Sequence, residues 1–357
     1  MSARLTSLLL TVALLAACKD DAPADDALSA FRAALPDEAT LAVDVPGDDA
    51  EVTDLGLTVQ QSALPLPATL RDWSHLARVF LTRTIGDLLD AFHDITKLRP
   101  VLKSEDRVVW WTPSKDGLFE ALLVMERDPD DGHFTFTSWL RDRGVGQSAW
   151  RFLAFGTVTP GETSGDGRGA LWIDLEHDRK PRTHGKVVVL WSEDRMARDL
   201  DVRAFDAATD GEAQQTRGYR YHEDRRGGVL AFDAGDVDVH VRPGDRDGME
   251  HVRVITRWDE ARRFRSDATS VGEEVVADGY RALVDTQCWQ APAATVLYDR
   301  RVGLARLDGH EETLLEEGDA QACPFARAAV PVLPTLGDMP TEPMAPPETD
   351  PARDWGD

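Results

Sequence analysis

The stretch Asp236-Val237-Asp238-Val239-His240-Val241-Arg242 alternates strictly between polar and apolar side chains. Because neighbouring side chains of a β-strand point to opposite faces, the three valines share one face and the four polar residues share the other. This pattern is typical of an antiparallel strand with one face on a core and the other in water. We therefore expect the fold to be built from strands of this kind.

The same two-residue period begins near Arg107 and recurs until about residue 290. Seven Asp-Gly pairs separate the periodic segments, and Asp-Gly is favoured in tight hairpin turns because both positions tolerate positive φ. The pattern predicts an antiparallel meander. Further strands are expected at 107–112, 118–127, 133–140, 150–155, 170–175, 186–191, 200–205, 218–222, 229–232, 251–258 and 280–286. The Asp-Gly pairs begin at Asp116, Asp131, Asp166, Asp210, Asp247, Asp278 and Asp308.

Apolar residues at helical spacing predict one long amphipathic helix over 70–98, which Pro100 ends and Gly86 kinks or breaks. A shorter helix is expected over 28–35. The predicted fold is mainly β: a long antiparallel meander forming a curved sheet or half-barrel packed on the one long helix. In architecture this is similar to periplasmic carriers of lipoproteins and lipids, whose half-open barrels hold acyl chains.

The N-terminus is predicted to carry an export signal. Arg4 is the only charge before an uncharged, mostly apolar run over 8–17, which is shorter than the roughly 20 apolar residues that a membrane-spanning helix needs. Leu15-Ala16-Ala17-Cys18 follows and resembles the lipobox of bacterial lipoproteins. The resemblance implies that Cys18 is acylated, with palmitate as a typical chain, and becomes the first residue of a membrane-anchored chain. An ordinary secretory signal with a chance cysteine is the alternative.

Lys19, rather than aspartate, follows the lipobox cysteine, so the resemblance implies an anchor in the outer membrane facing the periplasm. Only Cys288 and Cys323 then remain, and an even pair in an oxidising compartment predicts a disulfide. A zinc site or a nucleophilic cysteine are weaker readings of the same pair. The stretch 169–174, with Cys288-Trp289 and Cys323, also resembles a group of uncharacterised exported bacterial lipoproteins, which implies no function.

Four segments are expected along the chain. Residues 1–17 form the signal peptide, 18–27 a lipidated tether and 28–330 a β-rich globular domain. Residues 331–357 hold seven prolines and many acids, which predicts a disordered tail, or alternatively a partner-binding one.

The net charge of −24 and pI near 4.7 exclude nucleic acid as an expected partner. We identify no catalytic, cofactor-binding or metal-binding residues and expect no cofactor. His222-Glu223 and His310-Glu311 lack the second histidine of a zinc-binding helix. The glycines at 165, 167 and 169 suit a loop better than a phosphate-binding turn. The acidic residues at 128–131 and 245–247 suit hairpin turns better than a calcium loop. Asp174, Glu176, His177 and His184 come nearest to a metal site, but basic residues at 179–182 oppose a cation.

Ten tryptophans, most of them in expected strands, suit core packing or an aromatic lining for an apolar ligand. Two functions remain. The first is a non-enzymatic envelope lipoprotein that binds a hydrophobic ligand or another envelope protein. The alternative is an envelope hydrolase with a carboxylate pair assembled from distant strands.

Overall fold

The computed structural model describes residues 26–36, 38–41, 43, 87–113, 119–142, 150–161, 166–174, 183–209, 215–237, 250–291 and 295–329. The helices are α1 (Asp26–Ala34), α2 (Glu38–Leu41), α4 (Asp87–Lys97), α5 (Glu273–Ala277) and the 3₁₀ turn η3 (Ala320–Ala322). The strands are β1 (Leu102–Lys103), β2 (Arg107–Pro113), β3 (Phe119–Arg127), β4 (Phe134–Asp142), β5 (Arg151–Pro160), β6 (Gly167–Asp174), β7 (Thr183–Glu193), β8 (Ala197–Thr209), β9 (Gln215–Asp224), β10 (Gly227–Val237), β11 (Glu250–Asp259), β12 (Arg263–Gly272), β13 (Tyr280–Gln290), β14 (Thr295–Ala305) and β15 (Glu311–Gly318).

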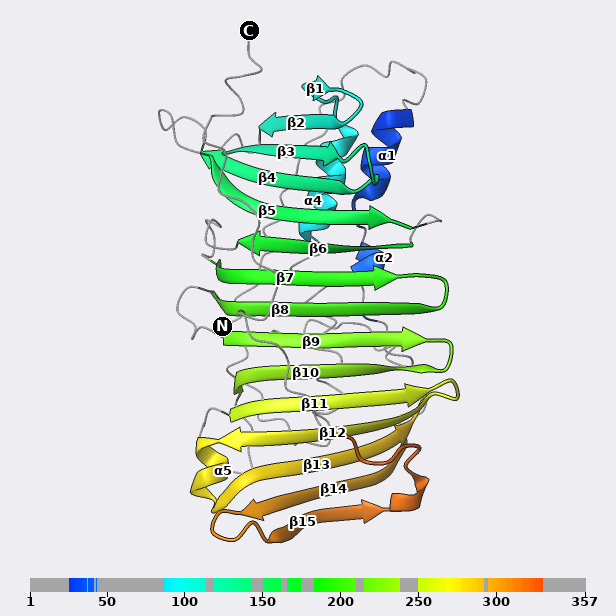
Figure 1. Ribbon diagram of the computed structural model, residues 1–357. Helices are drawn as coiled ribbons and strands as arrows, with labels where there is room; N and C mark the ends of the chain where they lie inside the picture. The colour runs from blue at the N-terminus through cyan, green and yellow to red at the C-terminus, as the bar shows by residue number, and fades with distance from the viewer. Residues whose placement is uncertain are drawn as a thin grey trace.

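All fifteen strands belong to one antiparallel sheet in which the order in space is the order in the chain, so the expected meander is confirmed. Figure 1 shows the strands stacked from β1 at one end to β15 at the other. The sheet does not close, because β1 and β15 are its two ends and do not pair with each other.

Each of the eleven further strands expected from alternation overlaps an observed strand, whereas β1, β12, β14 and β15 were not predicted. The stretch that shows the alternation most clearly, 236–242, is described only as far as Val237, where β10 ends; the rest lies outside the described residues. Buried Ser266 and Ser270 alternate with polar residues in β12, so hydrophobicity alone gives no two-residue period there.

The prediction of a single long helix packed on the sheet is not supported. The described helix α4 spans 11 residues and begins at Asp87, directly after Gly86, and residues 70–86 lie outside the described part. The shorter predicted helix is confirmed as α1.

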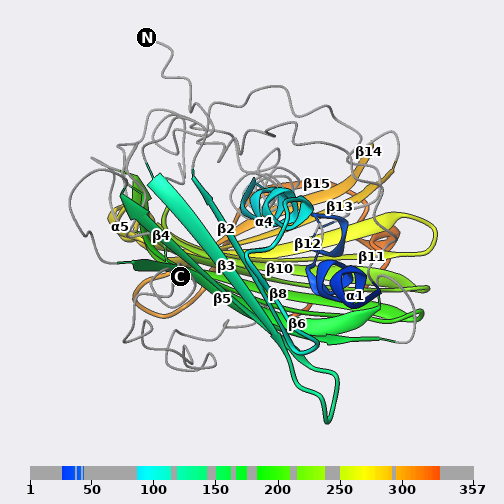
Figure 2. The ribbon, with the colours of Figure 1, turned by 90° about the horizontal axis from the view of Figure 1, so that it is seen from above.

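Alternate residues of each strand form two faces. The one that we call face A carries Trp110, Phe136, Val189, Tyr221 and Trp289 and is apolar across most of the sheet. Helices α1 and α4 pack on it, as Figure 2 shows from above. Phe31 of α1 meets the ring of Phe134 edge-on at 5.3 Å, and Phe92 of α4 meets Phe136 at 5.8 Å.

The opposite face, face B, changes character along the sheet. From β2 to β8 it holds a second buried apolar cluster. From β8 to β12 it carries arginine, aspartate and histidine side chains among apolar ones instead. The apolar cluster comprises Val109, Leu122, Val124, Trp139, Phe152, Phe155, Ala170, Trp172, Val188 and Phe205.

Two Asp-Gly pairs close hairpins, but through longer turns than the two-residue type expected. Gly132 (φ 71°) donates to the carbonyl of Asp128, and the amide of Asp128 donates to the carbonyl of His133. The same two bonds surround Gly309 (φ 72°). Glycine therefore occupies the left-handed position that ends a four-residue loop. The pairs at Asp116, Asp210 and Asp247 lie outside the described residues.

Candidate functional site

Cys288 lies fully buried in β13, and Cys323 follows η3. Their sulfur atoms are bonded and their Cα atoms lie 5.4 Å apart, so the pairing that the sequence predicts is present. The bond fixes the start of residues 323–329, which we call the strap. Figure 1 shows this segment after β15 returning over the front of β12 and β13.

The strap is held on face B by side chains of β11 and β12. The guanidinium of Arg265 donates to the carbonyl of Phe325 at 3.0 Å, and the guanidinium of Arg257 lies 5.2 Å from the Phe325 ring centre. The amide of Ala328 donates to Asp267 at 3.2 Å. The strap thus covers a buried carboxylate.

Asp267 is saturated by protein donors. Arg265 donates to both of its oxygens at 2.9 to 3.1 Å, Thr286 Oγ1 donates at 2.9 Å, and Arg257 lies at 3.4 Å. Burial lowers the pKa of Arg257, and the charge of Asp267 opposes that shift. A carboxylate so fully paired is suited to hold the strap rather than to bind a ligand.

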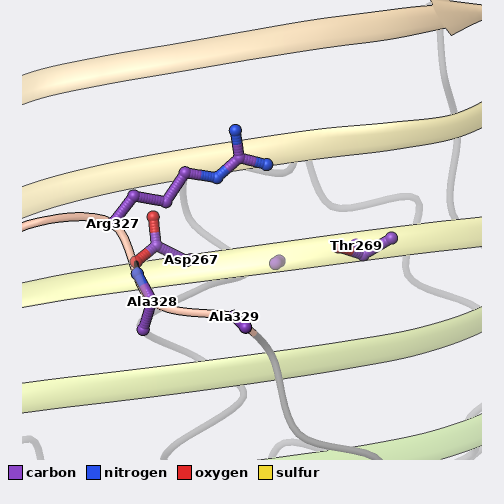
Figure 3. A pocket seen from close by; sticks show the side chains of 6 residues that line it. Asp267, Thr269, Arg327, Ala328 and Ala329 are labelled. Atoms are coloured by element: carbon purple, nitrogen blue, oxygen red, sulfur yellow. Dashed lines mark hydrogen bonds between the residues drawn. The ribbon is translucent and has the colours of Figure 1, made fainter. Parts of the chain in front are cut away.

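A cavity of about 380 Å³ lies between the strap and β12. In Figure 3 the side chain of Arg327 extends away from Asp267, and Thr269 lies farther along β12. The cavity therefore offers a hydroxyl, a guanidinium and backbone groups. Its lining residues are Asp267, Ala268, Thr269, Arg327, Ala328 and Ala329.

Face B also carries ion pairs within and between strands farther up the sheet. Asp201 of β8 pairs with Arg203 and with Arg220 of β9, each at 2.8 Å, and Asp233 of β10 pairs with Arg253 of β11 at 3.2 Å. Arg203 is only 2% exposed, and this burial lowers its pKa despite the nearby Asp201. These pairs form an ordered charged surface from β8 to β12.

On face A, the last strands bring two carboxylates together. Asp285 Oδ1 accepts a hydrogen bond from Arg301 Nε at 2.8 Å, whereas Oδ2 is buried without a partner. Burial raises the pKa of Asp285, and Arg301 opposes the shift. Asp299 lies opposite Gln287, which donates to it at 3.4 Å. Burial is also the main reason that the pKa of Asp299 is raised, and Glu317 raises it further.

Sequence reasoning missed Asp267, Asp285 and Asp299. Asp285 lies in an expected strand, but its partner Arg301 lies in β14, which the alternation did not reveal. Only the register of β12 to β14 places these side chains beside their partners. A sequence search that also accepted serine and threonine as inward-facing residues could have supplied that register.

Most tryptophans of the described strands pack in the core. Six are less than a tenth exposed, whereas Trp111 is 37% exposed. Trp289 stacks on Phe264 with ring centres 5.1 Å apart, and Trp258 continues this aromatic row at 6.2 Å from Phe264. The six buried tryptophans are Trp110, Trp139, Trp172, Trp191, Trp258 and Trp289.

The residues that came nearest to a metal site are only partly described. Asp174 ends β6 and His184 lies in β7, but Glu176 and His177 lie outside the described residues. Within the described ranges, no group of three or more histidine, cysteine or acidic residues is arranged to hold a metal ion. Asp128 and Asp131 accept backbone amides within a turn, as expected.

Cys18 and the whole N-terminal signal lie outside the described residues. Among the helices that are described, none has the length and apolar character needed to cross a membrane. In comparisons with known proteins, no family model, curated protein or solved structure matches the chain.

Proposed function

We propose that the protein is a lipid-anchored component of the bacterial envelope that binds another envelope protein and catalyses no reaction. The lipobox-like Leu15-Ala16-Ala17-Cys18 supports the anchor, and Lys19 supports an outer-membrane position facing the periplasm. The bonded Cys288 and Cys323 support an oxidising compartment. The membrane contact of this chain would be made by acyl chains on Cys18.

The observation that carries the binding role is the ordered charged surface on face B. Register fixes two of its ion pairs, because Asp201 lies opposite Arg220 on the next strand and Asp233 lies opposite Arg253. Such a surface presents charges without needing to order them on binding, which favours recognition of a partner with complementary charges. Charges spread over several neighbouring strands suit a protein partner better than a small ligand.

An apolar ligand, held by a half-barrel, is the other form of the binding hypothesis. The buried packing of six tryptophans weakens it, because their number is accounted for by the core. Titration of tryptophan fluorescence with a fatty acid and with a phospholipid separates the two forms. We expect no saturable change with either; a saturable change would reassign the ligand to an acyl chain.

A hydrolase is the second candidate, and one observation favours it. Asp285 and Asp299 lie in adjacent strands on one face with raised pKa values, as a general acid and its partner often do. Assays with chromogenic ester, phosphoester and glycoside substrates test this candidate. Hydrolysis that disappears in Asp285→Asn would replace our proposal with an enzymatic function.

Photo-crosslinking in the bacterial envelope tests the proposal directly. A crosslinking residue replaces Arg220 on face B, and the matched control replaces Arg195 in the exposed turn between β7 and β8. We expect one reproducible partner from position 220 and none from position 195. Loss of that partner in Cys18→Ala would show that anchoring brings the two together, whereas equal crosslinking from both positions would refute binding through face B.

A further inference from the structure

The last strand, β15, ends the sheet with an open edge. It pairs with β14 on one side, and no described strand lies on its other side. Antiparallel pairing leaves every second residue of an end strand with an amide and a carbonyl that point outward. The backbone bonds that flank β15, from Ala305 to His310 and from Asp319 to Leu297, set this alternation from each end. A register shift at Leu314 separates the two halves, so the amides of Thr313 and Glu316 both point outward.

The charges on β15 fall into two pairs. Its sequence is Glu311-Glu312-Thr313-Leu314-Leu315-Glu316-Glu317-Gly318, so two acidic pairs flank three uncharged residues. Register places Glu312 and Glu317 on face A and Glu311 and Glu316 on face B. All four glutamates are exposed.

Part of this charge is unfavourable within the protein itself. Glu317 lies directly opposite Asp299, and like charges opposite each other destabilise a strand pair. Asp285 has its Oδ2 buried without a partner. It lies two residues from Gln287 on β13, and Gln287 is opposite Asp299 on β14. Within the described residues, Arg301 is the positive charge that opposes Asp299, and Asp285 already engages Arg301.

We infer that the open edge of β15 binds an extended segment of another envelope protein, with two basic pairs separated by three uncharged residues, as a sixteenth antiparallel strand. Outward amides and carbonyls of β15 would pair with the backbone of this segment, and its basic pairs would lie opposite the acidic pairs. The inference rests on the proposed binding function and names the chemistry of the partner.

A second copy of this chain does not fit the edge. Two β15 strands would bring acidic pairs against acidic pairs. The other end of the sheet, β1, has only two residues and cannot supply a strand of matching length. Acidic side chains on an edge also deter self-association, and that role alone would predict no bound segment at all.

The experiment uses the full chain in mild detergent and a fluorescent peptide, Lys-Lys-Thr-Val-Thr-Lys-Lys, with capped ends. A second peptide has the same sequence with alternate amides N-methylated, which keeps the charge and removes strand pairing. We expect micromolar binding of the first peptide and at least tenfold weaker binding of the second. Equal binding of both would show surface electrostatics alone and overturn the inference, as would binding of neither.

Two pairs of variants locate the site. Thr313→Pro removes an outward amide without removing a bond to β14, and Thr313→Ala keeps that amide. Glu316→Lys with Glu317→Lys reverses one acidic pair, and Glu260→Lys with Glu273→Lys makes the same charge change at exposed sites elsewhere. We expect at least tenfold weaker binding for the first member of each pair only. Equal effects within either pair would overturn the inference.

Circular dichroism verifies that each variant folds. If a variant does not fold, the comparison of the two peptides on the parent protein still tests the inference. Failure of the peptide to bind, together with a specific partner crosslinked from position 220 on face B, would refute the edge and leave the proposed function standing. Failure of both experiments would refute the proposed function as well.

Discussion

Removal of the Cys288–Cys323 bond should lower the free energy of unfolding by about 4 kcal/mol. The two cysteines are 35 residues apart, and closing a loop of that length removes roughly 13 cal/mol/K of chain entropy from the unfolded state in the loop-closure model. The variant Cys288→Ser with Cys323→Ser tests this value. Release of the strap from Arg257 and Arg265 would add to the loss.

Equilibrium unfolding in urea measures the change, with the parent protein in reductant as a second route to the same state. We expect the reductant to lower the unfolding midpoint of the parent and to leave the variant unchanged. Alkylation of the unfolded, unreduced parent gives an independent reading. Modification of both cysteines, or equal midpoints for parent and variant, would refute the reasoning.

Three further predictions concern the anchor, the buried carboxylate and a tight contact. Cys18→Ala should leave an uncleaved precursor without palmitate labelling or detergent partitioning, and unchanged labelling would refute the lipoprotein reading. The pKa of Asp285 is raised on folding, so its contribution to stability is complete below the ordinary pKa near 3.8 and is lost as pH rises through the higher folded pKa. Urea unfolding from about pH 4 to 7 should therefore show a smaller decline of the free energy of unfolding in Asp285→Asn than in the parent. Equal declines would contradict the raised pKa. Gly218→Ala should cost about 1–3 kcal/mol, because the added Cβ would clash with Nη1 of buried Arg203. Gly235→Ala, whose added Cβ would have its nearest atom at 3.9 Å, serves as the control in thermal unfolding. Equal losses of stability would show that the Gly218 contact is not tight.

The sequence predicts the strands whose inward residues are apolar, since alternation of valine with charged residues has a direct physical cause. It does not predict β15, because an end strand has few buried side chains and its glutamates give no period. The single long helix is not supported, because the described helix α4 covers only Asp87–Lys97 of the expected 70–98 and the rest lies outside the described residues.

The charged clusters depend on pairs that are distant in the chain. Asp285 and Arg301 are 16 residues apart, and Asp267 and Ala328 are 61 apart. Neither pair has a local signal, because each arises from the register of a hairpin or from the path of the strap. The two cysteines were the exception, since their chemistry in an oxidising compartment predicts a bond without knowledge of the fold.

The agreement between chain order and spatial order makes the sheet a one-dimensional array. Each strand contacts chiefly its two sequence neighbours, so the stability of the array should approach a sum of neighbouring interfaces, as in repeat proteins. Such a sheet can begin to form at any hairpin and grow outward, with low contact order despite its size. Deleting or duplicating one hairpin would change the length of the sheet by about 10 Å while every other strand kept its neighbours.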